Sequence, residues 1–146
     1  MSPSGQVEIL LAEDDPADAE MTLRALRKNN LGNRVHWVKD GAEALEFMFS
    51  PPTQEGRAPG APKLILLDIK MPKVDGIEVL RRLKEDARTR MVPIVVMSSS
   101  NEERDVLETY RLGVNSYIVK PLHFDSFLET VAKIGLYWTA TNRAPA

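Results

Sequence analysis

The sequence contains no cysteine, which excludes a disulfide framework and any metal site built on thiolates. Its apolar runs are far shorter than the roughly 18 residues that a membrane-spanning helix needs. The net charge of -2 leaves no basic excess to bind the phosphates of a nucleic acid. Residues 1–6 lack both the basic start and the apolar stretch of a signal peptide. These absences favour a cytoplasmic protein with neither a nucleic acid nor a membrane among its partners.

The remaining composition is that of one ordinary globular domain. The 146 residues are 43% hydrophobic and 27% charged, which is enough to bury one sizeable core. We expect this domain to span residues 7–141, between a disordered N-terminus, 1–6, and a disordered tail, 142–146. Residues 50–62 contain four prolines and two glycines, so we predict an exposed loop inserted within the domain.

Short apolar runs alternate five times with segments of helical periodicity. The predicted strands are residues 7–12, 35–38, 64–67, 93–97 and 116–119. The second of these is the most polar, which suits a strand at the edge of a sheet. Strands that alternate with helices in this way form a parallel sheet covered by helices on both faces. The sequence therefore predicts an α/β fold.

Several residues mark the helix ends. Asp15 followed by Pro16 predicts an N-cap and a proline in the first turn. Residues 98–101 offer several caps for the fourth helix, which Gly113 should end. The pair 75–76, Asp-Gly, predicts a turn to which we assign no chemistry.

The last helix is predicted to begin near Phe124 and to be amphipathic. Its apolar face consists of Phe124, Phe127, Leu128, Val131, Gly135 and Trp138. Leu136 and Tyr137 fall off that face, so we expect them to form either a supplement to the core or, in preference, a subunit contact.

Polar residues follow four of the five predicted strands at the point where each strand ends. They are Glu13, Asp14 and Asp15 after the first strand, Asp68 after the third, Ser98 after the fourth, and Lys120-Pro121 after the fifth. In an open parallel sheet the carboxyl ends of the strands form the edge where ligands bind. The sequence therefore predicts one site built from side chains that are far apart along the chain.

The chemistry of these groups suits a divalent cation and a phosphoryl group. Carboxylates that converge in a partly buried site repel one another, and Mg²⁺ with oxygen ligands relieves that repulsion. The ammonium group of Lys120 is a second source of relief and is expected to pair with Asp68. Beside a metal ion, the Asp68 carboxylate can attack phosphorus and form an acyl phosphate, while Ser98 donates to a phosphoryl oxygen.

The order of these residues resembles the receiver domains of bacterial two-component response regulators over residues 7–134. The matching pieces are Glu13-Asp14 after Ile9-Leu10-Leu11-Ala12, Leu66-Leu67-Asp68-Ile69-Lys70-Met71-Pro72 with Asp75-Gly76, Ser98 after Val95-Val96-Met97, and Tyr117-Ile118-Val119-Lys120-Pro121. The resemblance implies a flavodoxin-like, doubly wound sheet of five parallel strands in the order 2-1-3-4-5. It also implies that a histidine kinase phosphorylates Asp68 and that the protein is not an enzyme acting on outside substrates.

The resemblance further assigns roles within the site. Asp14, Asp68 and the backbone carbonyl of Lys70 would bind Mg²⁺ directly, and Glu13 would act mostly through water. Ser98 and Tyr117 would be the switch pair, with Ser98 turning to the phosphoryl group and Tyr117 moving inward behind it. Lys120 would contact the phosphate.

Two further implications concern the chain beyond the site. The bond from Lys120 to Pro121 is often cis in this family. The output surface would be the fourth helix, the fifth strand and the fifth helix.

Residues 50–62 and the Tyr137-Trp138 helix resemble the small response regulators that partner phytochrome kinases. We therefore expect a stand-alone regulator that signals by contact with a downstream protein or phosphotransfer protein, with a homodimer through the C-terminal face.

Each site residue also has a plainer interpretation. Asp15 is favoured as a helix cap over a metal ligand, because Pro16 follows it. Ser98 could be a cap, Tyr117 a strand residue that packs on the fourth helix, and Lys120 a loop lysine. Packing of Tyr117 on the fourth helix is compatible with its role in the predicted switch. For Asp15, Ser98 and Lys120, the plainer interpretation is an alternative to a role in the predicted site.

Three other functions remain open on the sequence. A phosphohydrolase that forms an aspartyl phosphate needs a second aspartate two positions after the nucleophile, where this chain has Lys70. A flavin- or nucleotide-binding domain needs a phosphate loop after the first strand, where Glu13 and its acidic neighbours would repel a phosphate. A phosphorylation-independent adaptor is disfavoured because all the charged groups are present. His36 and His123 lie apart in the predicted fold, which disfavours a histidine metal site.

Overall fold

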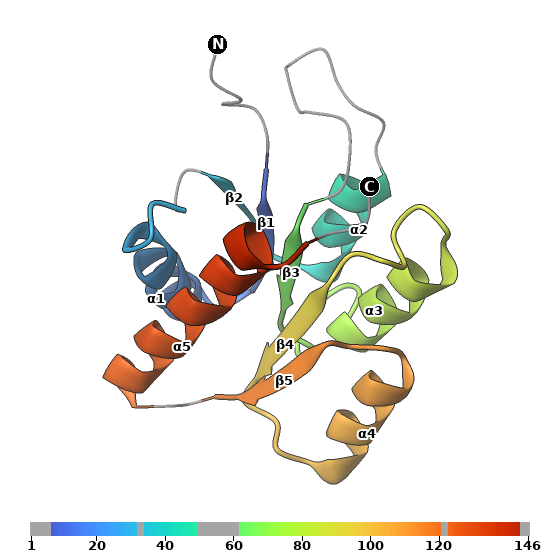
Figure 1. Ribbon diagram of the computed structural model, residues 1–146. Helices are drawn as coiled ribbons and strands as arrows, with labels where there is room; N and C mark the ends of the chain where they lie inside the picture. Colours follow the sequence, from blue (N-terminus) through green and yellow to red (C-terminus); the bar gives the residue numbers. More distant parts are fainter. Residues whose placement is uncertain (1–6, 32–33, 50–61, 121–122, 144–146) are drawn as a thin grey trace.

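The computed structural model describes residues 7–31, 34–49, 62–120 and 123–143 (Figure 1). Five parallel strands form one sheet in the order β2-β1-β3-β4-β5, which confirms the predicted topology. The strands are β1 (Ile9–Ala12), β2 (Val35–Val38), β3 (Leu64–Leu67), β4 (Ile94–Ser98) and β5 (Ser116–Val119). The predicted disordered N-terminus, 1–6, most of the predicted disordered tail, 142–146, and most of the predicted loop, 50–62, lie outside the described residues.

Helices cover both faces of the sheet, as the alternating pattern predicts (Figure 1). They are α1 (Pro16–Arg27), α2 (Gly41–Phe49), α3 (Gly76–Glu85), α4 (Glu103–Arg111) and α5 (Phe124–Leu136), followed by the π-helical turn η2 (Tyr137–Thr141). The helices α1 and α5 pack side by side on one face, and α2, α3 and α4 lie on the other. Within the described residues, no helix has the length and apolarity to cross a bilayer.

Two hydrophobic cores result from the alternation of side chains along the strands. In β1, Ile9 and Leu11 belong to the core under α1 and α5, whereas Leu10 and Ala12 belong to the core under α2 and α3. The central strands are therefore buried on both faces and are continuously apolar in sequence. The predicted edge strand β2 is only partly buried and lies at the sheet edge.

Two helix caps fix the chain where it leaves the carboxyl edge of the sheet. The Asp15 side chain accepts hydrogen bonds from the backbone N–H groups of Ala17 (2.8 Å) and Asp18, so the predicted cap of α1 is confirmed. Asp75, predicted only in a turn, caps α3 by accepting from the Glu78 N–H at 3.0 Å. Gly76 presses against the loop after β3, since a Cβ there would lie 2.4 Å from the Asp68 carbonyl oxygen.

The predicted start of α4 is wrong. Ser98 is the last residue of β4, and α4 begins only at Glu103, after an N-cap, Glu102, that makes no side-chain capping bond. The Ser100 hydroxyl instead hydrogen-bonds the side chain of Asp105, within the helix. The end of α4 is as predicted, because the chain turns at Gly113 with a φ of 98°.

The amphipathic pattern of α5 is borne out. Phe127, Leu128 and Val131 are buried against the sheet, while Leu136 and Tyr137 remain 44% and 48% exposed. The side chain of Phe124, predicted on the same face, lies outside the part of the chain that the structure describes.

Polar contacts fix the end of the chain at the amino-terminal edge of the sheet. The Lys63 ammonium group, one residue before β3, donates to the carbonyl oxygen of Thr139 at 3.2 Å. It also forms an ion pair with the buried Glu8 at 3.2 Å, and Arg34 pairs with the same carboxylate. The η2 turn therefore lies at the end of the sheet opposite the residues that follow the strands.

Candidate metal centre

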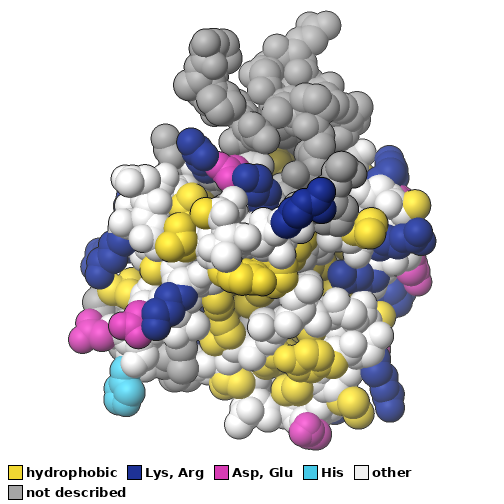
Figure 2. All heavy atoms as spheres, in the orientation of Figure 1, with side chains coloured by type: hydrophobic (Ala, Val, Ile, Leu, Met, Phe, Trp, Pro, Cys, Tyr) yellow, Lys and Arg dark blue, Asp and Glu magenta, His cyan; other side chains and the backbone are white. Residues whose placement is uncertain are grey.

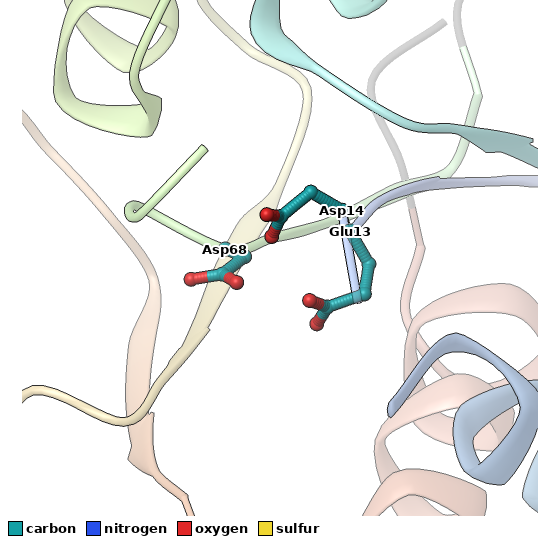
Figure 3. Close-up of side chains that lie close together, drawn as sticks. All are labelled: Glu13, Asp14 and Asp68. Atoms are coloured by element: carbon teal, nitrogen blue, oxygen red, sulfur yellow. The ribbon is translucent and has the colours of Figure 1, made fainter. Parts of the chain in front are cut away.

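Three carboxylates meet at the carboxyl edge of the sheet, as predicted. One ligand oxygen from each of Glu13, Asp14 and Asp68 lies within 4.8 Å of the others (Figure 3). The pairing of β1 with β3 explains this, because Ala12 is opposite Leu67 and the next residues of both strands therefore fall side by side. Glu13 and Asp68 are buried, at 1% and 7% exposure, whereas Asp14 is exposed.

The loop after β3 fixes the orientation of Asp68. Its backbone N–H donates to the carbonyl oxygen of Ala12 at 3.0 Å, which ties the residue to the end of β1. Its Oδ1 atom accepts from the Lys70 N–H at 3.0 Å. The carboxylate is therefore held next to Asp14 and Glu13 before any ligand binds.

Lys120 enters the same cluster from the end of β5. Its Nζ atom lies 2.8 Å from Glu13 Oε1 and 2.8 Å from Asp18 Oδ2. The predicted partner, Asp68, is farther away, with Oδ2 at 3.9 Å. One buried ammonium group thus links the first turn of α1 to two of the three clustered carboxylates.

The charges in this cluster do not balance without a bound proton or cation. Burial raises the pKa of Glu13 to about 8, and the nearby charge of Asp68 adds to the effect. Burial also raises the pKa of Asp68. Burial acts to lower the pKa of Lys120, but its hydrogen bonds with Asp18 and Glu13 outweigh this and leave the pKa raised. The cluster therefore retains a proton at neutral pH that a divalent cation could displace, and its donors are all oxygens, as Mg²⁺ or Mn²⁺ prefers.

The predicted switch residues lie beside this cluster and share one neighbour. Ser98 is fully buried at the end of β4, and its Oγ accepts from the Ser100 N–H at 3.1 Å. The half-buried Tyr117 donates its hydroxyl hydrogen to the Ser100 carbonyl oxygen at 2.9 Å. Ser100, predicted as one of several caps, thus connects the end of β4 to Tyr117 on β5.

Other candidate residues do not join the site. Asp15 caps α1 and is absent from the group of three carboxylates. His36 lies on β2, at one edge of the sheet, and stacks on Phe47, whereas His123 precedes α5 after the strand at the opposite edge. Pro121 lies outside the described residues, as does the predicted cis bond that leads to it.

The sequence interpretation missed two acidic residues that contact the predicted ones. Asp18 binds Lys120, and Asp105 binds Ser100. The position of Asp18 could have been predicted to lie near the site, because the residue comes three positions after the N-cap of α1. The first turn of a helix that follows a parallel strand begins at the edge where the ligand site lies.

Comparisons with known proteins agree with this geometry. Residues 9–132 match the family model of the response regulator receiver domain. The probable methanogenesis regulatory protein FilR2 of Methanothrix harundinacea (strain 6Ac) is 39% identical over 137 residues, which cover 94% of this chain and 86% of FilR2. Response regulator Rcp1 of Synechocystis sp. (strain ATCC 27184 / PCC 6803 / Kazusa) is 34% identical over 140 residues, which cover 94% of this chain and 92% of Rcp1.

Solved structures give the same result. The phosphorylated cyanobacterial phytochrome response regulator RcpA superimposes with a TM-score of 0.85 at 35% identity, covering 97% of this chain and 99% of RcpA. The Mn²⁺-bound form of Rcp1 superimposes with a TM-score of 0.82 at 33% identity, covering 94% of this chain and 98% of that one. A structural relative therefore holds a divalent metal, and another is phosphorylated. The chain belongs to the family of response regulator receiver domains.

Proposed function

We propose that this protein accepts a phosphoryl group from a histidine kinase onto Asp68 and passes the signal on by protein contact. The observation that carries the proposal is the meeting of Glu13, Asp14 and Asp68 within 4.8 Å, with the Lys120 ammonium group at their side. Phosphorylation of an aspartate is the general mechanism of the family to which the chain belongs.

A magnesium ion fits the donor set of this site. Asp14, Asp68 and the backbone carbonyl of Lys70 would hold it directly, and Glu13 would act mostly through water. When bound, the ion neutralises charge on the phosphoryl oxygens. The Mn²⁺-bound form of Rcp1 supports a divalent cation at such a site, and the all-oxygen donors make Mg²⁺ the proposed one.

The transfer itself needs little from the protein beyond position and charge. A carboxylate oxygen of Asp68 attacks phosphorus, and the bond from phosphorus to the kinase imidazole nitrogen breaks, its electron pair remaining on the imidazole. Lys120 offsets the negative charge of the phosphoryl oxygens from the β5 side. Water later attacks phosphorus, the bond from phosphorus to the Asp68 oxygen breaks, and the release of inorganic phosphate restores the carboxylate and ends the signal.

The change of state starts from Ser98. Its hydroxyl oxygen accepts from the Ser100 N–H, and in this proposal the side chain turns so that its own O–H donates to a phosphoryl oxygen on Asp68. That turn releases the Ser100 N–H, and Ser100 also holds the Tyr117 hydroxyl. Movement of Ser98 is thereby passed to β5 and to the start of α4.

The surface proposed to read this change carries exposed apolar side chains. Figure 2 shows hydrophobic side chains gathered between α5 and α4, over β5. On α4, Leu107 is 48% exposed and Tyr110 is 51% exposed, and the end of α5 and the start of η2 add Leu136 and Tyr137. Apolar groups of this size on a small domain suit a protein partner. We assign the α4 side to a downstream protein or phosphotransfer protein, and the C-terminal side to a second copy of the chain.

The kinase is proposed from the relatives. RcpA is a cyanobacterial phytochrome response regulator, and it aligns with nearly the whole of this chain. A phytochrome-type histidine kinase is therefore the proposed source of the phosphoryl group.

Intact-mass spectrometry after incubation with acetyl phosphate tests the chemistry. We expect one added phosphoryl group on the wild type in the presence of Mg²⁺, and none without Mg²⁺ or in Asp68→Asn. The matched control is Asp15→Asn, which removes an adjacent carboxylate, keeps the cap of α1 and should still be phosphorylated. A phosphoryl group retained by Asp68→Asn would place the modification elsewhere. No modification of the wild type by acetyl phosphate or by a phytochrome-type kinase would favour a phosphorylation-independent adaptor.

A further inference from the structure

Among the buried carboxylates outside the metal centre, Asp105 lies on the first turn of α4. Asp105 is 7% exposed, and its Oδ2 atom contacts side chains from two different loops. The Ser100 hydroxyl, in the loop after β4, lies 2.5 Å away. The Lys70 ammonium group, in the loop after β3, lies 3.7 Å away.

Each of the two loops also contacts a residue of the proposed switch. The Lys70 backbone N–H donates to Asp68 Oδ1 at 3.0 Å, while its side chain remains 54% exposed and extends to Asp105. The Ser100 N–H donates to Ser98 Oγ, and the Ser100 carbonyl accepts from Tyr117. Asp105 is thus the side chain of α4 that contacts both loops flanking the phosphoacceptor.

We propose that Asp105 is a positioning residue of the phosphorylation switch, which holds the Lys70 ammonium group toward α4 until a phosphoryl group on Asp68 competes for it. The inference rests on the proposed function, because the competing charge is the phosphoryl group. When Lys70 leaves, Asp105 keeps only the Ser100 hydroxyl of these two contacts. Negative charge on Asp68 would then change the contacts at the start of α4 through both the loop after β3 and the loop after β4.

The proposal predicts whether a mutation of Asp105 raises or lowers the affinity for a phosphoryl analogue. Trifluoroberyllate, which binds an aspartate carboxylate in the presence of Mg²⁺, is the probe. Asp105→Asn keeps an oxygen that can accept from Ser100 but removes the charge that holds Lys70. We expect this variant to bind trifluoroberyllate about two- to fivefold more tightly than the wild type, the range set by a partly exposed ion pair.

A double-mutant cycle separates this role from a structural one. In a Lys70→Met background, Asp105→Asn should change the affinity by less than half as much, because the competing ammonium group is gone. The matched controls are Glu103→Gln, an exposed acid on the same turn of α4, and Lys73→Met, whose ammonium group pairs with Asp40. An acid that only stabilised the start of α4 would show no coupling to Lys70. Equal effects of Asp105→Asn in both backgrounds, or a weaker affinity, would overturn the proposal.

A measurement on the wild type keeps the test independent of how the variants fold. The ¹³Cε resonance of Lys70 should shift when trifluoroberyllate and Mg²⁺ are added, whereas that of Lys73 should not. An unmoved Lys70 resonance, with the probe bound, would refute the competition. Failure of the wild type to bind the probe at Asp68, with Asp68→Asn as reference, would instead refute the proposed function.

Discussion

Lowering the pH from 8 to 6 should weaken Mg²⁺ binding steeply. The metal-free cluster retains a proton because burial raises the pKa of Glu13 to about 8. A divalent cation must expel that proton, so its affinity rises with pH up to about 8 and is constant above it. Each unit below the pKa costs about 1.36 kcal/mol, so at pH 6 the penalty is about 2.7 kcal/mol. At pH 8 half of the sites are still protonated, so the apparent dissociation constant for Mg²⁺ should be about 50-fold larger at pH 6 than at pH 8.

The protein contains its own probe for this measurement. Trp37 donates its indole N–H to the backbone carbonyl of Glu13 at 2.8 Å, so its fluorescence should respond to a cation at the cluster. The other tryptophan, Trp138, lies in η2 at the opposite end of the sheet, and Trp138→Phe removes its signal. Mg²⁺ titrations of this variant at pH 6, 7, 8 and 9 would give the dependence directly.

Two variants test the assignment to Glu13. Glu13→Gln removes the titrating group and should make the Mg²⁺ affinity nearly independent of pH between 6 and 8. Asp15→Asn changes a neighbouring carboxylate that caps α1 and should leave the dependence intact. A flat profile in the wild type between pH 6 and 8 would show that no proton is displaced, and the reasoning from burial would be wrong.

Three further outcomes follow from the same contacts. The metal-free protein should lose stability as the pH rises from 4.5 to about 8, because Glu13 binds its proton more tightly in the folded state than in the unfolded state. Saturating Mg²⁺ should reduce this loss, and urea unfolding at pH 5 and pH 8, with and without Mg²⁺, measures both effects. Lys120→Met removes the ammonium group between Glu13 and Asp18 and should lower the free energy of unfolding by about 3 kcal/mol at pH 8, and a loss below 1 kcal/mol would contradict a structural role for the pair. Asp75→Ala removes the cap of α3 and should cost about 1 kcal/mol in urea unfolding while leaving the phosphorylation yield unchanged; a large loss of yield would show that α3 takes part in the chemistry.

The part of the site that the sequence predicts is the part determined by strand register. Glu13 and Asp68 directly follow apolar runs, and two parallel strands in register bring the next residues together. The buried strands are themselves predictable, since both of their faces are covered and their sequences are continuously apolar.

The missed residues lie on helices, where the sequence does not fix the side-chain direction. Asp18 and Asp105 both belong to first turns, and acids in that position are common as favourable neighbours of the helix dipole. Whether such an acid binds Lys120 or Ser100 depends on how the helix is rotated against the sheet. The partners of Lys120 differ from the prediction for a related reason, because only the packed α1 brings Asp18 close enough to compete with Asp68.

The contact of Lys63 with Thr139 places the C-terminal turn and the phosphorylation site at opposite ends of the sheet. It holds η2 at the amino-terminal edge of the sheet, whereas Asp68 lies at the carboxyl edge. A partner or a second copy seated on Leu136 and Tyr137 would leave the approach to Asp68 uncovered. The protein could then remain attached at one end through repeated rounds of phosphorylation at the other, and a dye or an affinity label at Thr141 would not obstruct the kinase.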